Sequence, residues 1–145
     1  MTEIIFYTYF ISDNIEGHKC HIMTISVNNY NCIYDSVCNG KMVTEFQVGP
    51  EHLNQRGTLH GGFIAHLVDA ISTYALQSNE NIDTRGVSVD LSVSYMNAAK
   101  EGDNIEVEAV TRKLGKKIAF LEVEVRNKDN NKVLATGRHT KYVGI

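Results

Sequence analysis

One long segment with helical spacing, followed only by alternating segments, limits the folds open to this chain. Residues 61–80 place apolar side chains at Ile64, Leu67, Val68 and Ile71, which lie on one face of a helix. We expect a helix of about 17 residues (about 61–78). Because most of its sides are apolar, the helix should be well buried.

After this segment the period of the pattern changes from helical spacing to two. Residues 87–95 alternate, with Val87, Val89, Leu91, Val93 and Tyr95 on one face and Ser88, Asp90, Ser92 and Ser94 on the other. Three more strands are expected at 104–114, 116–127 and 132–143, and an earlier one at 41–48. The short Gly/Asn turns between them favour antiparallel pairing. We predict an α+β fold, an antiparallel sheet wrapped around one long central helix.

The first 30 residues give a weaker pattern. Residues 4–11 (IIFYTYFI) and 21–27 (HIMTISV) are rich in β-branched and aromatic residues, so propensity favours strands in both. We treat residues 1–30 as a separate N-terminal segment and 31–145 as one domain, in a chain of 145 residues.

Charge and composition exclude several classes of protein. The net charge of −3 gives no general reason to expect nucleic-acid binding. The charge is uneven, since residues 1–84 hold three basic and nine acidic side chains and residues 85–145 hold eleven basic and eight acidic. No apolar run is long enough for a membrane-spanning helix, and no secretory or Arg-rich transit signal is visible. Three irregularly spaced cysteines fit a reducing compartment, with the cysteines as small, half-buried hydrophobic residues.

A glycine-rich loop runs directly into the expected helix. Gly57, Gly61 and Gly62 stand in the segment NQRGTLHGG, and the free N–H groups of Gly61 and Gly62 would lie at the positive end of the helix. That arrangement suits a carbonyl oxygen or a developing oxyanion. The alternative is a flexible loop with a helix cap. No Walker lysine and no G-x-S-x-G sequence is present, which argues against a P-loop and an α/β-hydrolase.

Asp69 lies inside the apolar helix, where a carboxylate is costly unless it is paired or functional. It is either a catalytic carboxylate or an acidic residue on the polar edge of the helix. His60 either takes part in the chemistry or fixes the loop. His66 and Asp69 are three residues apart, but no third ligand follows at a recognisable spacing, so we expect no metal.

Several motifs together resemble the hotdog-fold acyl-CoA thioesterases. They are GTLHGG followed by six residues and Asp69, then GVSVDLSVSYM, AAKEGD, GKKIAFLEVEVRN and ATGRHTKYV. The resemblance runs from about Tyr30 to Gly144, and the first 30 residues diverge from it. It implies hydrolysis of medium- to long-chain acyl-CoA to fatty acid and coenzyme A, with no cofactor, because coenzyme A is part of the substrate.

The resemblance also implies roles for five residues. The Gly61 N–H would polarise the thioester carbonyl, and Asn54 would help to hold that carbonyl or the water. Asp69 would be the general base or the nucleophile, and both options stay open. Ser88 would orient the water or the carboxylate, and His60 would shape the pocket.

Basic residues in the C-terminal half gain a role from the same resemblance, since the phosphates of coenzyme A bind well to Lys and Arg. Arg138 and Lys141 in the last strand are further candidates for this role, although a solvated hairpin is the alternative. Where the family usually has Pro, this chain has Ala98. The segments implied to bind coenzyme A contain Tyr95, Met96, Asn97, Ala98, Ala99, Lys100, Lys113, Leu114, Gly115, Lys116, Lys117 and Ile118, with Tyr142 nearby.

The spacing of Gly61 and Asp69 constrains any mechanism that uses both. Eight residues of helix separate them by about 12 Å, whereas reacting atoms must approach within about 3–3.5 Å. A second subunit with an antiparallel helix can supply Asp69 to Gly61, which predicts a homodimer with two shared sites. The resemblance implies a homotetramer made of two such dimers.

Two alternatives to a thioesterase stay open. One is a non-catalytic acyl-CoA-binding hotdog protein, and the other is a hotdog enoyl-CoA hydratase or dehydratase. We expect a role in lipid metabolism in the cytoplasm, with the mitochondrion as the alternative location.

Overall fold

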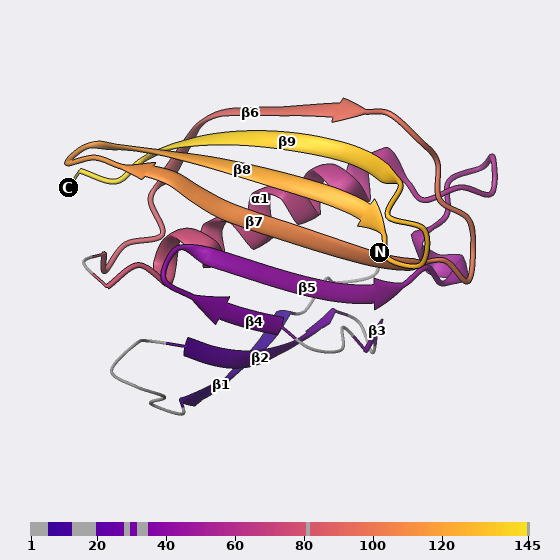
Figure 1. Ribbon diagram of the computed structural model, residues 1–145, viewed down its shortest axis with the longest axis horizontal. Helices are drawn as coiled ribbons and strands as arrows, with labels where there is room; N and C mark the ends of the chain where they lie inside the picture. The colour runs from indigo at the N-terminus through magenta and orange to yellow at the C-terminus, as the bar shows by residue number, and fades with distance from the viewer. Residues whose placement is uncertain (1–5, 13–19, 28–29, 32–34, 81, 145) are drawn as a thin grey trace.

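The computed structural model describes residues 6–12, 20–27, 30–31, 35–80 and 82–144. Within them one long helix lies against one face of a large antiparallel sheet (Figure 1). This confirms the predicted α+β architecture. The elements are β1 (Phe6–Ser12), β2 (Cys20–Val27), β3 (Tyr30–Asn31), β4 (Asp35–Cys38), β5 (Lys41–Gln47), a 3-10 helix η1 (Pro50–His52), α1 (Gly61–Gln77), β6 (Val87–Tyr95), β7 (Asn104–Leu114), β8 (Ile118–Asn127) and β9 (Val133–Tyr142).

The strands are ordered β1-β2-β4-β5-β7-β8-β9-β6, with β3 paired to β2 beside this path. The chain therefore leaves β5, passes through α1 and returns at the far edge of the sheet as β6, next to β9. The two N-terminal strands expected from propensity are present as β1 and β2, and β2 pairs with β4. Part of the N-terminal segment thus extends the sheet.

The core lies between α1 and the inner face of the sheet. Along β7 and β8, buried and partly exposed residues alternate, as the period-two pattern predicted. On the helix, Ile64, Val68 and Ile71 are buried as expected. Gly137 on β9 lets α1 approach closely, because a Cβ built there would lie 2.4 Å from Val68 Cγ1.

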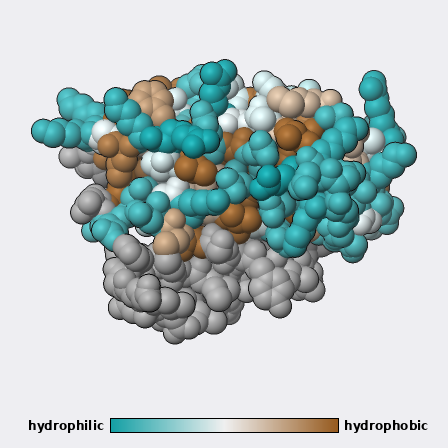
Figure 2. Space-filling model, in the orientation of Figure 1, coloured by the Kyte–Doolittle hydropathy of each residue, from teal (hydrophilic) through white to brown (hydrophobic). Residues whose placement is uncertain are grey.

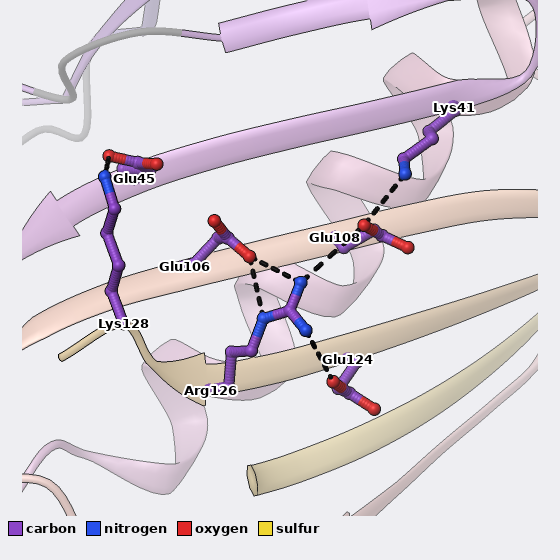
Figure 3. Close-up of polar contacts among 7 residues, drawn as sticks. All are labelled: Lys41, Glu45, Glu106, Glu108, Glu124, Arg126 and Lys128. Atoms are coloured by element: carbon purple, nitrogen blue, oxygen red, sulfur yellow. Dashed lines mark hydrogen bonds and ion pairs between the residues drawn. The ribbon is translucent and has the colours of Figure 1, made fainter. Parts of the chain in front are cut away.

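The outer face of the same strands is largely hydrophilic, with hydrophobic residues showing between the polar ones (Figure 2). Arg126 on β8 directs its guanidinium at Glu106, Glu108 and Glu124 (Figure 3). Its Nε donates to Glu106 at 2.7 Å, and this hydrogen bond is the largest cause of its raised pKa. These ion pairs tie β7 to β8 across the face opposite the helix.

Two further observations concern the expectations from composition. No helix in the described part of the chain is long and apolar enough to cross a membrane. Cys38 is disulfide-bonded, and its Cα partner across the β2–β4 pair is Cys20. The expectation that the cysteines are unbridged is therefore wrong for Cys38.

Candidate active site

Asn54 organises the loop that leads into α1. Its Oδ1 accepts hydrogen bonds from the backbone N–H groups of Arg56 and Thr58, at 2.9 and 3.3 Å. Its Nδ2 donates to Thr58 Oγ1, and Gly57 completes the turn with a φ of 72°. The Asn54 amide, which was predicted to hold the carbonyl or the water, thus makes most of its hydrogen bonds within the loop. A shallow pocket lies against this loop, lined by Leu53, Asn54, Gln55, Arg56 and His60.

His60 caps the N-terminus of α1. Its Nδ1 accepts the Gly62 N–H at 2.9 Å, and its carbonyl accepts the N–H groups of Phe63 and Ile64. The Gly62 N–H is therefore occupied, and the expectation that it is free is wrong. The Gly61 N–H has no acceptor among the described residues, which makes it the open donor at the positive end of the helix.

Tyr95 from β6 lies directly beside Gly61. Its hydroxyl donates to the Gly61 carbonyl at 2.9 Å, and a Cβ on Gly61 would contact its ring at 3.4 Å. The next residues pack on the same loop, because Leu59 N–H donates to the Ala99 carbonyl and Thr58 forms a bridge with Lys100. The segment that includes Tyr95, Ala99 and Lys100 thus packs against the start of α1 and the loop before it.

Asp69 lies two turns further along α1, with its side chain 50% exposed. Its Oδ1 is 3.8 Å from Nε2 of His139, a β9 residue that is only 1% exposed. Ser88 Oγ from β6 lies 2.9 Å from the same nitrogen. The structure therefore gathers Asp69 and Ser88, both predicted site residues, around a histidine that sequence reasoning missed.

A β-bulge places Ser88 there. The register between β6 and β9 shifts between Ser88 and Asp90, so Val89 is the extra residue. Strict alternation would put Ser88 on the face opposite Leu91. With the bulge, Ser88 reaches His139, the cross-strand partner of Leu91. The expected face of Ser88 is therefore wrong, and the local shift of register is the cause.

His139 and Lys141 share the helix-facing side of β9. Burial lowers the pKa of His139, the nearby Lys141 ammonium lowers it further, and Asp69 and Asp90 oppose both effects. Burial also lowers the pKa of Lys141, while Asp69 raises it. Lys141 is buried and its Nζ donates to Thr73 Oγ1 at 2.7 Å, so the alternative that placed it on a solvated hairpin is wrong. Lys141 follows Gly137 and His139 at intervals of two residues, and this spacing could have indicated that all three share one face of β9.

The remaining residues predicted to bind coenzyme A lie at the other end of the molecule. The hairpin from Lys113 to Ile118 joins β7 to β8, and Tyr142 is the cross-strand partner of Ile118. Leu114 packs near Leu76, by the end of α1. Since α1 has 17 residues, about 25 Å of helix separate this hairpin from Gly61 (Figure 1).

Fold and site together define a protein in which a sheet wraps one helix, with an open backbone donor at the helix start and a carboxylate two turns later. The sequence model of the thioesterase superfamily matches residues 56–134. Human acyl-coenzyme A thioesterase 13 is 48% identical over 109 residues, which cover 75% of this chain and 77% of that protein. The chain belongs to the thioesterase superfamily and has its hotdog fold.

Solved structures agree with this assignment. Zebra fish thioesterase superfamily member 2 is 49% identical, with a TM-score of 0.71 over 73% of this chain and 76% of that one. A Streptococcus mutans protein with bound acetyl-CoA is 26% identical, with a TM-score of 0.70 over 80% of this chain and 89% of that one.

Proposed function

We propose that this protein hydrolyses acyl-CoA thioesters at two identical sites, each shared between two subunits. Membership of the superfamily supports thioester hydrolysis, and the 48% identity to a human acyl-coenzyme A thioesterase supports acyl-CoA as the substrate class. The observation that carries the shared site is the spacing of its residues along α1, because about 12 Å of helix separate the Gly61 N–H from Asp69.

Pairing of two copies through their β6 strands would bring the separated residues of one site together. This strand is an edge of the sheet, and Val87 and Val89 are 69% and 61% exposed. Antiparallel pairing of two β6 strands brings the Tyr95 end of one subunit beside the Val87 end of its partner. Since Val87 is the cross-strand partner of Tyr142, the Gly61 end of one subunit then meets the Tyr142 and Ile118 end of the other.

In the proposed reaction, the thioester carbonyl oxygen accepts the Gly61 N–H of one subunit. Asp69 of the partner subunit takes a proton from water as the water oxygen attacks the carbonyl carbon. Negative charge collects on the carbonyl oxygen, where the N–H and the helix dipole stabilise it. The C–S bond then breaks, and the coenzyme A thiolate takes the proton from Asp69. Direct attack by Asp69 is the alternative, and oxygen-isotope labelling in a single turnover distinguishes the two.

The proposal also covers where the acyl group binds and how the subunits assemble. The chemistry needs no cofactor. Apolar side chains exposed on and near β6, including Leu91 and Met96, offer surfaces between subunits for a medium- or long-chain acyl group. Two dimers in a homotetramer complete the assembly suggested by the resemblance to the family.

The first experiment measures thiol release from acyl-CoAs of rising chain length, for wild type and Asp69→Ala. We expect turnover in the wild type and a loss of at least about 100-fold in the variant. Asp129→Ala, in the exposed turn between β8 and β9, is the matched control and should keep full activity. Binding of coenzyme A without turnover would instead favour an acyl-CoA-binding protein, and hydration of enoyl-CoA without thiol release would favour a hydratase.

A further inference from the structure

His139 is a buried group that the proposed reaction does not use. It projects from β9 toward α1 with 1% of its surface exposed, and both ring nitrogens have partners. Nδ1 lies 2.7 Å from Ser72 Oγ on α1, and Nε2 lies 2.9 Å from Ser88 Oγ on β6. A single ring thus links the helix that carries Asp69 to the strand that carries Ser88.

The hydrogen-bond partners of Ser72 are the basis on which we assign the imidazole proton. Ser72 Oγ is 3.1 Å from the backbone carbonyl of Asp69, which can only accept. A hydroxyl has one proton, and we assign the Ser72 proton to that carbonyl, which makes Ser72 Oγ the acceptor of His139 Nδ1–H. A neutral imidazole has one N–H, which leaves Nε2 as an acceptor. In this assignment Ser88 donates its own proton to Nε2.

In this assignment Ser88 Oγ can only accept hydrogen bonds at the site. Asp69 Oδ1 and Ser88 Oγ flank the same ring nitrogen, at 3.8 and 2.9 Å. A water held by the carboxylate then has a second acceptor beside it. With both hydrogens directed at Asp69 and Ser88, the water oxygen presents a lone pair for attack.

We propose that His139 is a positioning residue that holds the Ser88 hydroxyl as an acceptor for the hydrolytic water. The inference rests on the proposed thioesterase function and adds a residue to it. It differs from a purely structural role because it depends on which ring nitrogen carries the proton.

The charged groups around the His139 imidazole determine how kcat depends on pH. The groups that face His139 are Asp69 from α1, Lys141 from β9 and Asp90 from β6. Burial and the Lys141 ammonium keep the ring neutral near pH 7 by lowering its pKa. Protonation at lower pH would make Nε2 a donor, turn the Ser88 hydrogen toward the water and lower kcat.

Two substitutions test the roles of the two ring nitrogens separately. His139→Asn can still donate to Ser72 from its δ-position amide but has no acceptor at the ε position. His139→Gln can accept from Ser88 at the ε position. We expect His139→Asn to lower kcat by about 10- to 100-fold with KM little changed, and His139→Gln to keep most of the activity. In a Ser88→Ala background, His139→Asn should cause no further loss.

The opposite results would overturn the proposal. These are equal losses in both variants together with a lower melting temperature, or a full further loss from His139→Asn in the Ser88→Ala background. A second measurement is independent of activity, because imidazole ¹⁵N shifts report the tautomer in wild type and in Ser88→Ala. A wild type without turnover would end the proposed function while the tautomer still tests the His139–Ser88 bond. An active wild type with the proton on Nε2 would end this proposal alone.

Discussion

The role proposed for Gly61 uses its backbone N–H, so a test needs a substitution that removes a backbone group. The preceding residue, His60, has φ −67° and ψ 127°, a conformation that suits a residue before proline. Gly61 is the first residue of α1, where proline is well tolerated because its missing N–H has no helical acceptor.

We therefore predict that Gly61→Pro keeps the helix and loses the donor. The expected loss in kcat is about 100- to 1,000-fold, because one oxyanion donor is removed. The measurement is steady-state kinetics together with circular dichroism. Gly61→Ala retains the N–H and should lose much less activity. Similar losses in the two variants would mean that the N–H has no catalytic role.

His52 lies beneath the same loop and makes its stability depend on pH. Its Nδ1 accepts the Gly49 N–H at 2.9 Å, and its ring stacks on Phe63 with 4.8 Å between centroids. Burial lowers its pKa from 6.5, and Glu51 opposes this shift. Above pH 6.5 the ring is neutral in both the folded and unfolded states, so its contribution to stability is fully present there.

We predict that the free energy of unfolding falls as the pH drops below 6.5 toward the lower pKa of folded His52. The unfolded chain binds a proton in this range that folded His52 does not. His52→Asn keeps an acceptor for the Gly49 N–H and does not titrate, so it should reduce this dependence, while the part due to His139, whose pKa is also lowered, remains. The measurement is chemical denaturation from about pH 7.5 to about pH 5, with His66→Gln as the control. An unchanged slope in His52→Asn would contradict the prediction.

At the scale of elements, Gly137 sets how closely β9 approaches α1. We predict that Gly137→Ala destabilises the protein by about 1–3 kcal/mol, because its Cβ would meet the stiff, fully buried Val68. Thermal or chemical denaturation measures the effect. The double variant Val68→Ala/Gly137→Ala should show less than the sum of the two single losses. Additive losses would mean that the two side chains do not meet.

The elements were largely predictable from sequence, because their apolar spacing is regular. The helix begins at Gly61 as expected, and the strands at 87–95 and 104–114 have the predicted bounds. What the pattern could not give is the bulge at Val89. A bulge depends on the register of a strand far away in sequence, and it decides the face on which Ser88 lies.

The site was predictable in part. The residue types and their spacing predicted Gly61 at the start of the helix and Asp69 two turns later, where the structure has them. The second subunit inferred from their distance along the helix stays a prediction. His139 was missed because alternation shows which residues share a face but not which face is buried. The satisfied Gly62 N–H was missed because the conformation of the His60 side chain is not encoded in spacing.

At the scale of the whole molecule, the proposed shared site would let two defective chains correct each other. We predict that co-expressed Gly61→Pro and Asp69→Ala chains recover about a quarter of wild-type activity. Half of the randomly formed dimers are mixed, and each mixed dimer holds one intact site of two. The measurement is thiol release by the mixture compared with each variant alone. A mixture as inactive as its components would place both groups of a site in one chain.

The position of β6 in the sheet has a consequence for how the protein is made. Its neighbour β9 begins about 40 residues after β6 ends, so a ribosome releases the strand carrying Ser88 well before the strand that supports it. During that interval β6 has no partner on either side, and its exposed valines are open to other chains. His139 arrives with β9, so the contacts of Ser88 and Asp69 with its ring form only when synthesis reaches the C-terminal strand. A chain that stops before Val133 therefore lacks β9 and leaves β6 unpaired, which exposes that strand to association with other chains.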